Sequence, residues 1–542
     1  MLNDSIQSFG DKMNKTTIQI FGGLNVIGGN KICIIAGNGK AAMLDFGLDF
    51  EIARKYTDSF LKLRDKEYLL DAMWVGMLPR PEGILKNLYR EDLMLHEQQD
   101  LKEILNVDVD PTALPLVTDV LLSHLHTDHS ALIRYLHSKI KLVTGKTTAI
   151  LFDHFNLVSR ANSSLRGVNE CKMVYSKGEN GEIEYDEKAE AVSRQTIQLE
   201  DKATTFVAGD GLAATFIETD HSVPGAGGFL IRDTGTGAKI AYTGDIRMHG
   251  NGSKAKHFID AARNFEPDVL ITEGTRVGRK HDEKNLPSEA DVKRELMEYL
   301  KTVDQEKMIF FDCSARDVWR FITFQDAAKE IGRHLVIDAD IYLLLERCKN
   351  MGVPGTEGIN VNDMFIYINK ASSGMYQPRD YSYSQEIVEA FTDPARKNDK
   401  GAKYTKLDFS LRPNVKAKDI RDHPENYMMY LPFFSMNELP DLHPPDGSCH
   451  IKSASGPYDD EGKLDDKKKK NWLNLFHLTN RFQVHCSGHA SPEAIKEMIE
   501  TIAPKIVIPV HTEHAEMFAE LMKDNVKSAL KIIEKDVPYV IK

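Results

Sequence analysis

A short run of histidines with one aspartate carries the clearest chemistry in this sequence. The run Ser123-His124-Leu125-His126-Thr127-Asp128-His129 directly follows the apolar residues 119–122. A strand that ends there would point His124 and His126 to the same side, because alternate side chains of a strand share a face. Zinc accepts histidine nitrogen and carboxylate oxygen, and a catalytic zinc keeps one position for water. The run therefore predicts a catalytic zinc site.

Three later residues extend this candidate site. His221 follows the apolar residues 214–218, Asp245 follows residues 239–241, and His511 follows residues 506–510. Each of these apolar segments has the length and composition of a strand, so each polar side chain is expected at a strand end. The candidate metal ligands are His124, His126, Asp128, His129, His221, Asp245 and His511.

Length and charge limit the architecture and the partners. At 542 residues the chain is too long for one ordinary core. Because candidate ligands lie at 124–245 and again at 511, the chain must leave the catalytic domain and return to it, which predicts an inserted domain. A net charge of −12 disfavours a generic nucleic-acid binder with a basic surface. It still permits a cleft in which metal cations and local lysine or arginine attract a polyanion.

Cysteine spacing and hydropathy indicate the compartment. The six cysteines show no Cys-x-x-Cys spacing, which is typical of free thiols in a reducing environment. The first residues lack a basic region followed by an apolar core, and no run of about 18 apolar residues occurs. We therefore predict a cytoplasmic protein without a membrane partner.

Patterns along the chain predict the order of its elements. Residues 1–15 are polar and expected to be flexible, and Asn38-Gly39 predicts a hairpin turn between two strands. Residues 50–115 form an extra insert with a helix expected at 60–72; we consider it a cap over the cleft or a surface for a protein partner. From 288 to 338, helix and strand patterns alternate, which predicts a mostly parallel, doubly wound sheet. The lysine run 467–470 is interpreted as a solvated face, with RNA contact as the alternative.

These motifs resemble those of a known enzyme group. Asp45, the run from His124 to His129, His221 and Asp245 match, in order, the four motifs of the metallo-β-lactamase fold hydrolases. Glu273, His489 and His511 look like motifs A, B and C of the β-CASP nucleases. Residues 21–30 and the run Ser487-Gly488-His489-Ala490-Ser491 are most similar to ribonuclease J. The resemblance covers about residues 17 to 515.

The resemblance implies a fold class and a division into domains. The expected architecture is α/β, a metallo-β-lactamase αββα sandwich with an inserted β-CASP domain whose doubly wound sheet is mostly parallel. Residues 16–284 and 481–542 would form the sandwich, and 285–480 the inserted domain. Only 31 residues follow His511, so no separate C-terminal domain is expected. A homodimer, which rests on that domain in some relatives, is left open.

The resemblance also implies roles for the site residues. One zinc would be held by His124, His126 and His221, and a second by Asp128, His129 and His511, with Asp245 bridging. Manganese or magnesium in addition is left open. Asp45 would orient ligands and Asp128 would belong to the catalytic group, while Glu273 and His489 would transfer protons. Ser314, Ser487, Ala490 and Ser491 would hold a 5′ phosphate.

The function implied is zinc-dependent hydrolysis of RNA in RNA processing or decay, from the 5′ end toward the 3′ end, with endonuclease activity left open. Alternatives are an endonuclease of the RNA 3′-end type and a DNA nuclease, although a histidine such as His511 at motif C accompanies RNA substrates in this group. A small-molecule metallohydrolase and an RNA-binding scaffold are weaker alternatives, because the inserted domain argues against the first and the intact ligand set against the second.

Overall fold

The computed structural model describes residues 14–58, 60–64, 68–158, 170–186, 191–202, 204–250, 253–279, 286–370, 374–376, 412–456, 460–523 and 527–541. The expected flexible segment 1–15, apart from its last two residues, and the expected domain boundary at 284–285 lie outside them. Within the described residues, no helix is long and apolar enough to cross a membrane.

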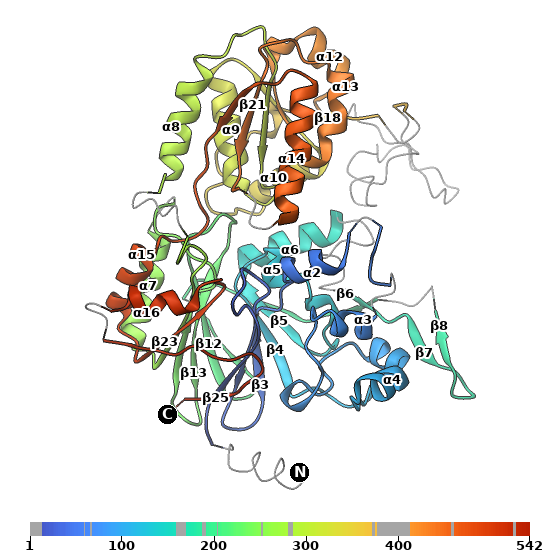
Figure 1. The fold of residues 1–542 in the computed structure, drawn as a ribbon, viewed down its shortest axis with the longest axis vertical. Helices are drawn as coiled ribbons and strands as arrows, with labels where there is room; N and C mark the ends of the chain where they lie inside the picture. The colour runs from blue at the N-terminus through green and yellow to red at the C-terminus, as the bar shows by residue number, and fades with distance from the viewer. Residues whose placement is uncertain are drawn as a thin grey trace.

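Two mixed sheets form the lower lobe of the molecule (Figure 1). In the first sheet, β1, β2 and β3 are antiparallel and β3, β4, β5 and β10 are parallel. The predicted hairpin at Asn38-Gly39 joins β2 to β3, with Gly39 at a φ of +82°. The order of strands is β10 (Thr196–Leu199), β5 (Lys141–Gly145), β4 (Val117–Leu122), β3 (Ala41–Leu44), β2 (Lys31–Ile35), β1 (Thr17–Gly22) and β25 (Tyr539–Val540).

The second sheet begins as an antiparallel meander and continues as parallel strands. Its strand β23 pairs with β15 although more than 230 residues separate them in the sequence. The order of strands is β11 (Thr205–Ala208), β12 (Leu212–Glu218), β13 (Gly227–Asp233), β14 (Lys239–Tyr242), β15 (Val269–Glu273), β23 (Ile506–Val510) and β24 (Ala529–Leu530).

Alternating apolar side chains hold the two sheets together. Ile32 and Ile34 of β2 point into the space between the sheets, where they belong to the same buried cluster as Phe229 and Ile508, whereas Cys33 belongs to the cluster on the outer face. Helices α7 (Lys254–Phe265), α15 (Pro492–Ile502) and α16 (Phe518–Leu521) cover the outer face of the second sheet. The arrangement is the expected αββα sandwich.

The extra insert at 50–115 covers the outer face of the first sheet with α3 (Leu69–Trp74) and α4 (Glu91–Leu105). The helix expected at 60–72 is wrong in its extent, because residues 60–64 are not helical and α3 begins at Leu69. The Glu97 carboxylate of α4 accepts the first amide hydrogens of α3, from Leu69 and Leu70, at 2.7 Å each. Burial raises the pKa of Glu97 to about 7.

A third sheet forms the upper lobe (Figure 1). All of its strand pairs are parallel. Helices α8 (Glu289–Leu300), α9 (Val318–Glu330) and α10 (Ala339–Asn350) pack on one face, and α12 (Ala417–Asp422), α13 (Leu439–Leu442) and α14 (Asp460–Leu475) on the other. Helices on both faces make this a doubly wound sheet. The order of strands is β19 (Asn414–Lys416), β18 (Met364–Ile368), β17 (His334–Ile337), β20 (Tyr427–Tyr430), β16 (Ile309–Cys313), β21 (Cys449–Ser453) and β22 (Asn480–Gln483).

The predicted fold class is confirmed: a mixed α/β sandwich carries a second unit, whose described strand pairs are all parallel. Element ends differ from the prediction where a local cap decides them. The helix expected to begin at residue 315 begins at Val318, because the Asp317 side chain accepts the amide hydrogen of Arg320 and caps the helix. Two ribbons were not predicted from the sequence: β6 (Glu170–Lys172) with β9 (Ala191–Ser193), and β7 (Tyr175–Lys177) with β8 (Ile183–Tyr185).

Candidate metal centre

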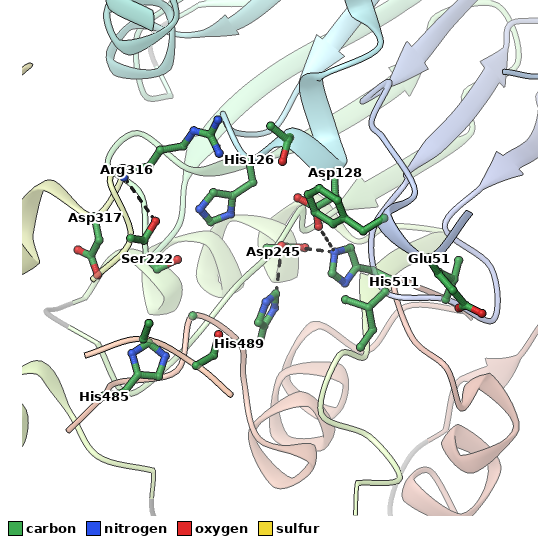
Figure 2. Close-up of a pocket in the computed structure, with 18 of the residues that line it drawn as sticks. Glu51, His126, Asp128, Ser222, Asp245, Arg316, Asp317, His485, His489 and His511 are labelled. Carbon is green, nitrogen blue, oxygen red and sulfur yellow. Dashed lines mark hydrogen bonds and ion pairs between the residues drawn. The ribbon is translucent and has the colours of Figure 1, made fainter. Parts of the chain in front are cut away.

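The candidate ligands meet at one edge of the sandwich, where strands of both sheets end. His124 and His126 follow β4, and Asp128 and His129 lie on the single helical turn α5 (Thr127–Ser130). His221, Asp245 and His511 follow β12, β14 and β23, respectively. Figure 2 shows His126, Asp128, Asp245, His489 and His511 around one cavity. The structure thus brings together all seven residues that the sequence indicated as metal ligands.

The first group of ligands is His124, His126, His221 and Asp245. His126 Nδ1 lies 3.1 Å from His124 Nε2 and 3.0 Å from His221 Nε2. Asp245 Oδ2 lies 3.6 Å from each of these two Nε2 atoms. Tetrahedral zinc with bonds of about 2.0 to 2.1 Å separates its ligand atoms by roughly 3.3 Å. The spacing of the four atoms is therefore that of zinc ligands.

Hydrogen bonds outside this group fix which ring nitrogens face inward. His221 Nδ1 donates to the Gly488 carbonyl at 2.5 Å, and His124 Nδ1 lies 3.0 Å from Ser123 Oγ. Burial lowers the pKa of His124 and of His221 well below the usual value, so both rings are neutral. Their Nε2 lone pairs then both face His126 Nδ1, an arrangement that a bound cation would stabilise.

Gly488 is required for this contact. A Cβ atom at residue 488 would lie 2.8 Å from the His221 ring. The backbone can therefore approach the ring closely enough to accept its proton only with glycine at this position.

The second group of ligands is Asp128, His129 and His511. His511 Nε2 lies 3.2 Å from Asp128 Oδ2, and His129 Nε2 lies 3.9 Å from the same oxygen. Asp245 Oδ2 lies 3.3 Å from His129 Nε2 and 3.7 Å from His511 Nε2. Asp245 thus stands between the two groups, in contact distance of both.

Two buried atoms of the candidate ligands, His129 Nε2 and Asp245 Oδ1, lack hydrogen-bond partners within the described residues. Buried polar atoms without a partner are costly and uncommon in folded proteins. A divalent cation would satisfy both, so the residues present fit the zinc ions that the sequence implied.

Asp45 holds the His129 ring from behind. Its carboxylate accepts hydrogen bonds from the Ser123 amide at 2.7 Å, the Ser123 hydroxyl at 2.8 Å and the Tyr242 hydroxyl at 2.6 Å. Its Oδ2 also lies 2.7 Å from His129 Nδ1, which leaves Nε2 as the ligand atom. Asp45 adopts a φ of +57°, a strained conformation for this residue type that is typical of functional sites.

Thr275 contacts Nδ1 of the His511 ring, as Asp45 contacts Nδ1 of the His129 ring. Its hydroxyl oxygen lies 2.8 Å from His511 Nδ1, and the hydroxyl donates to the His511 carbonyl at 3.3 Å. Sequence patterns gave no indication of Thr275 or of Tyr242, because each partner lies about 200 or more residues away and only the folded chain joins them.

Glu273 and His489 form an ion pair beside the metal ligands. Glu273 Oε2 lies 2.9 Å from His489 Nδ1, and Glu273 Oε1 accepts the Ile246 amide hydrogen at 2.9 Å. Burial acts to lower the pKa of His489, but the charges of Glu273 and Asp245 outweigh it, and the pKa is raised. The ring is therefore poised to carry a proton near neutral pH, with Nε2 as the atom free to donate it.

The cavity at this site has a volume of about 350 Å³ and is built by both lobes and the insert. Phe50, Glu51 and Arg54 of helix α2 (Phe50–Tyr56) line one side, so the insert at 50–115 contributes to the wall. Ser314 and Arg316 of the upper lobe line the cavity as well, and Figure 2 shows Arg316 there. The lining contains five carboxylates and two guanidinium groups. Without bound cations such a surface would repel a phosphate.

The expected phosphate-binding residues do not all reach this cavity. Ser314 lines it. Ala490 is instead buried in the core under the second sheet, and its amide donates to the Ile246 carbonyl. Ser491 caps α15 by accepting the Ala494 amide hydrogen, and the Ser487 hydroxyl is engaged with the backbone of His489. Ser487, Ala490 and Ser491 thus do not line the cavity, whereas Ser222, Ser453 and Ser455 line it with Ser314.

A buried ionic network joins the two lobes behind the cavity. The Glu289 carboxylate of α8 accepts from Arg247 at 2.9 Å and from Arg320 of α9 at 2.6 Å. Arg247 follows β14 and also contacts Asp220, the residue before His221, at 3.2 Å. Both arginines are fully buried. We name this set, Asp220, Arg247, Glu289 and Arg320, the interlobe ion network.

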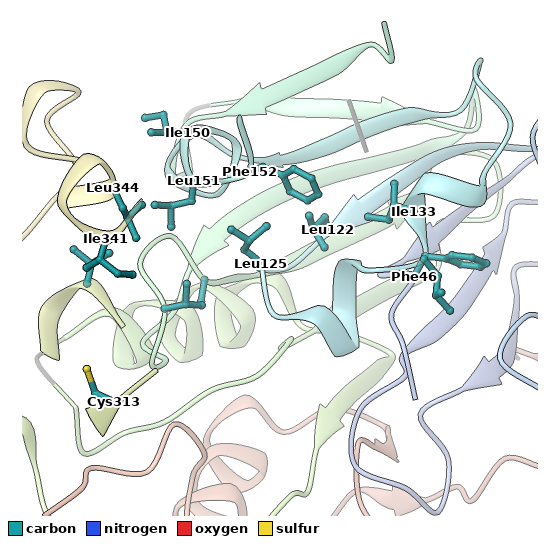
Figure 3. Packing of buried hydrophobic residues seen from close by; sticks show 14 of the residues in the cluster. Phe46, Leu122, Leu125, Ile133, Ile150, Leu151, Phe152, Cys313, Ile341 and Leu344 are labelled. Carbon is teal, nitrogen blue, oxygen red and sulfur yellow. The ribbon is translucent and has the colours of Figure 1, made fainter. Parts of the chain in front are cut away.

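Apolar contacts strengthen the same interface. Leu125 and Leu151 of the sandwich belong to one buried cluster with Cys313, Ile341 and Leu344 of the upper lobe (Figure 3). A continuous core and a buried ionic network fix the cavity wall contributed by Ser314 and Arg316 relative to the ligands of the sandwich.

A comparison with protein families bears on the metal centre. Residues 479–537, which include His489 and His511, match the family model described as Zn-dependent metallo-hydrolase RNA specificity domain. This match supports a zinc-dependent metallo-hydrolase. A search of curated proteins found no match.

Solved structures extend the comparison of the fold. A protein of unknown function from Enterococcus faecalis V583 covers 97% of this chain and 100% of its own, with 20% sequence identity and a TM-score of 0.64. The metallo-beta-lactamase fold protein YhfI from Bacillus subtilis covers 49% of this chain and 74% of its own, with 13% identity and a TM-score of 0.24. The similarity to the Enterococcus faecalis protein shows a shared fold across nearly the whole chain.

Proposed function

We propose that this protein is a zinc-dependent ribonuclease with two zinc ions per chain, which hydrolyses RNA phosphodiester bonds from the 5′ end toward the 3′ end. The observation that carries the proposal is the pair of ligand groups with Asp245 between them, beside the Glu273–His489 ion pair. Zinc bound by these groups would activate water and withdraw charge from the phosphoryl oxygens. It would also offset the carboxylates that line the cavity.

In this proposal the protein's own side chains position the ions and move protons. Asp45 and Thr275 hold the rings of His129 and His511, so that each presents Nε2 to the cavity. Glu273 holds His489 at Nδ1, and His489 Nε2 donates its proton to the oxygen that leaves when the phosphodiester bond breaks. The buried Glu273 carboxylate stabilises the imidazolium before that transfer.

The upper lobe supplies the contacts that would hold the 5′ phosphate. Ser314, Ser453 and Ser455 offer hydroxyl groups on the cavity wall, and Arg316 adds a positive charge on the same side. A terminal phosphate seated there would set the scissile bond at a fixed distance from the chain end. This geometry favours removal of nucleotides from the 5′ end over internal cleavage.

A matched set of labelled substrates tests the proposal. RNA and DNA of one sequence, each with a 5′ hydroxyl, monophosphate or triphosphate, are incubated with the zinc-loaded protein and with His126→Ala. We expect mononucleotide release from 5′-monophosphate RNA by the wild type and none by His126→Ala. Internal cuts regardless of the 5′ end would indicate an endonuclease, and equal cleavage of DNA would indicate a nuclease without RNA preference. Full activity of His126→Ala would contradict the catalytic role of the metal centre.

A further inference from the structure

A second cavity lies on the upper lobe between α14 and the strands β21 and β22. It has a volume of about 440 Å³ and is lined by four cationic side chains, Lys452, Lys469, Lys470 and Arg481, and one carboxylate, Asp466. We name it the basic groove. The excess of cations contrasts with the carboxylate-rich metal cavity and with the net charge of −12 for the whole chain.

The strand register explains why these cations gather. His450 and Lys452 of β21 are two residues apart and so share a face of the sheet. Their partners in β22 are Arg481 and Gln483, whose side chains point to the same face. Asp466, Lys469, Lys470 and Leu473 of α14, at helical spacing, form the opposite wall.

The cations of the groove outnumber the carboxylates that pair with them. Lys452 and Lys470 share Asp466, at 3.2 and 2.7 Å, and Lys469 pairs with Asp312. Arg481 donates to two neutral groups, the Leu478 carbonyl at 2.8 Å and the Asn474 side chain at 2.5 Å. His450 is 2% exposed, and its Nε2 has no hydrogen-bond partner within the described residues. Burial lowers the pKa of His450 well below the usual value, so the ring is neutral. The groove thus offers cations for phosphates and an acceptor for a ribose hydroxyl or a base amino group.

The basic groove adjoins the metal cavity at the carboxyl edge of the third sheet. Lys452 and Gly456 line the groove, while the residues between them, Ser453 and Ser455 among them, line the metal cavity. A chain that crosses this edge passes from one cavity to the other. The serine hydroxyls on the crossing are compatible with a phosphodiester backbone.

We propose that the basic groove binds the single-stranded RNA that continues beyond the metal cavity. The inference rests on the proposed function, because it extends the path of the same substrate. Cations that follow a groove are the usual means of binding a single-stranded backbone without sequence preference. On a chain with an acidic overall charge, such a local patch also guides a polyanion toward the cavity beside it.

The test compares two double variants of helix α14 and its neighbour. Lys470→Gln with Arg481→Gln removes two charges from the groove, whereas Lys467→Gln with Lys468→Gln removes two exposed charges of the same helix that do not line it. Binding of 5′-monophosphate RNA with a non-hydrolysable backbone is measured to the zinc-loaded proteins, with oligonucleotides of about 3 and about 16 nucleotides that bracket typical single-strand sites.

We expect the groove variant to bind the long RNA roughly tenfold more weakly, with a salt dependence reduced by about 1.4 in slope, as for two lost phosphate contacts. The control variant should retain wild-type affinity, and neither should change binding of the short RNA. Hydrolysis of bis(4-nitrophenyl) phosphate, which reaches only the metal cavity, should be equal in all three zinc-loaded proteins.

Equal affinity of both variants for long RNA would overturn the inference. If the wild type cleaves RNA in that case, the proposed function stands alone. A wild-type protein that neither binds nor cleaves RNA would overturn the inference and the proposed function together.

Discussion

Replacement of Glu289 by glutamine tests whether the interlobe ion network holds the cavity together. Glu289 lies at the start of α8 and bridges Arg247 of the sandwich and Arg320 of the upper lobe. Both guanidinium groups are fully buried, so the lost charge leaves them with no equivalent partner at this position. The glutamine keeps the shape of the side chain and one acceptor oxygen, which isolates the effect of the charge.

The expected cost follows from the burial of the three charges. Breaking a buried ion pair costs about 3 to 5 kcal/mol, because the remaining charge stays desolvated. Arg247 keeps Asp220 as a partner at 3.2 Å, so we expect the lower end of this range. A loss of about 3 kcal/mol lowers the thermal midpoint of a domain of 150–250 residues by about 6–12 °C.

The assay is thermal unfolding of Glu289→Gln and of the control Glu295→Gln, which removes an exposed carboxylate from the same helix. Zinc content should be unchanged in both, since the ligands belong to the sandwich. The RNA hydrolysis that we propose should fall in Glu289→Gln, because a displaced cavity wall would position the substrate less well. Equal thermal midpoints for the two variants would refute the role of the network.

Three further perturbations have defined outcomes. Asp245→Ala should lower the zinc content of the purified protein close to zero by elemental analysis, because Asp245 Oδ2 lies near both ligand groups. His126→Ala should retain the second ion. Equal zinc loss in the two variants would argue against a position of Asp245 between two ions. Asp45→Asn should weaken zinc binding by about 10- to 100-fold in competition with a chelator, because His129 loses its oriented partner; unchanged affinity would exclude that role. Glu97 has a folded pKa of about 7, above its ordinary value of 4.5, so its contribution to the free energy of unfolding is complete below pH 4.5 and is lost as pH rises through 7. Over this range the free energy of unfolding of the wild type should fall by up to roughly 3 kcal/mol, and its thermal midpoint with it, whereas Glu97→Gln should show no such fall. Parallel pH profiles of the two thermal midpoints would contradict this role of Glu97.

Residues that follow apolar strand patterns could be located from the sequence. β23 has the predicted bounds 506–510, and His511 follows it directly. The reason is physical: a short apolar run between turn residues has few alternatives to a buried strand. Convergence of these strand ends at one edge then follows from the parallel order of the strands.

Residues whose role depends on a distant partner could not be located. Arg247, Tyr242 and Thr275 have no pattern of their own, and their contacts join segments far apart in the sequence. Ser491 differs in the opposite way: its place two residues after His489 predicts a phosphate contact, but its side chain caps α15. Local sequence indicates whether a segment forms a helix or a strand. The hydrogen-bond partners of its polar side chains depend on the segments that pack against it.

The pairing of β23 with β15 has a consequence for the timing of protein synthesis. The first ligand group is complete once Asp245 has left the ribosome, but His511 is added only after the whole upper lobe has been made. A nascent or truncated chain that ends anywhere in between has one ligand group and an unfinished second sheet. The order of the chain therefore delays completion of the second ligand group until the whole upper lobe has been made.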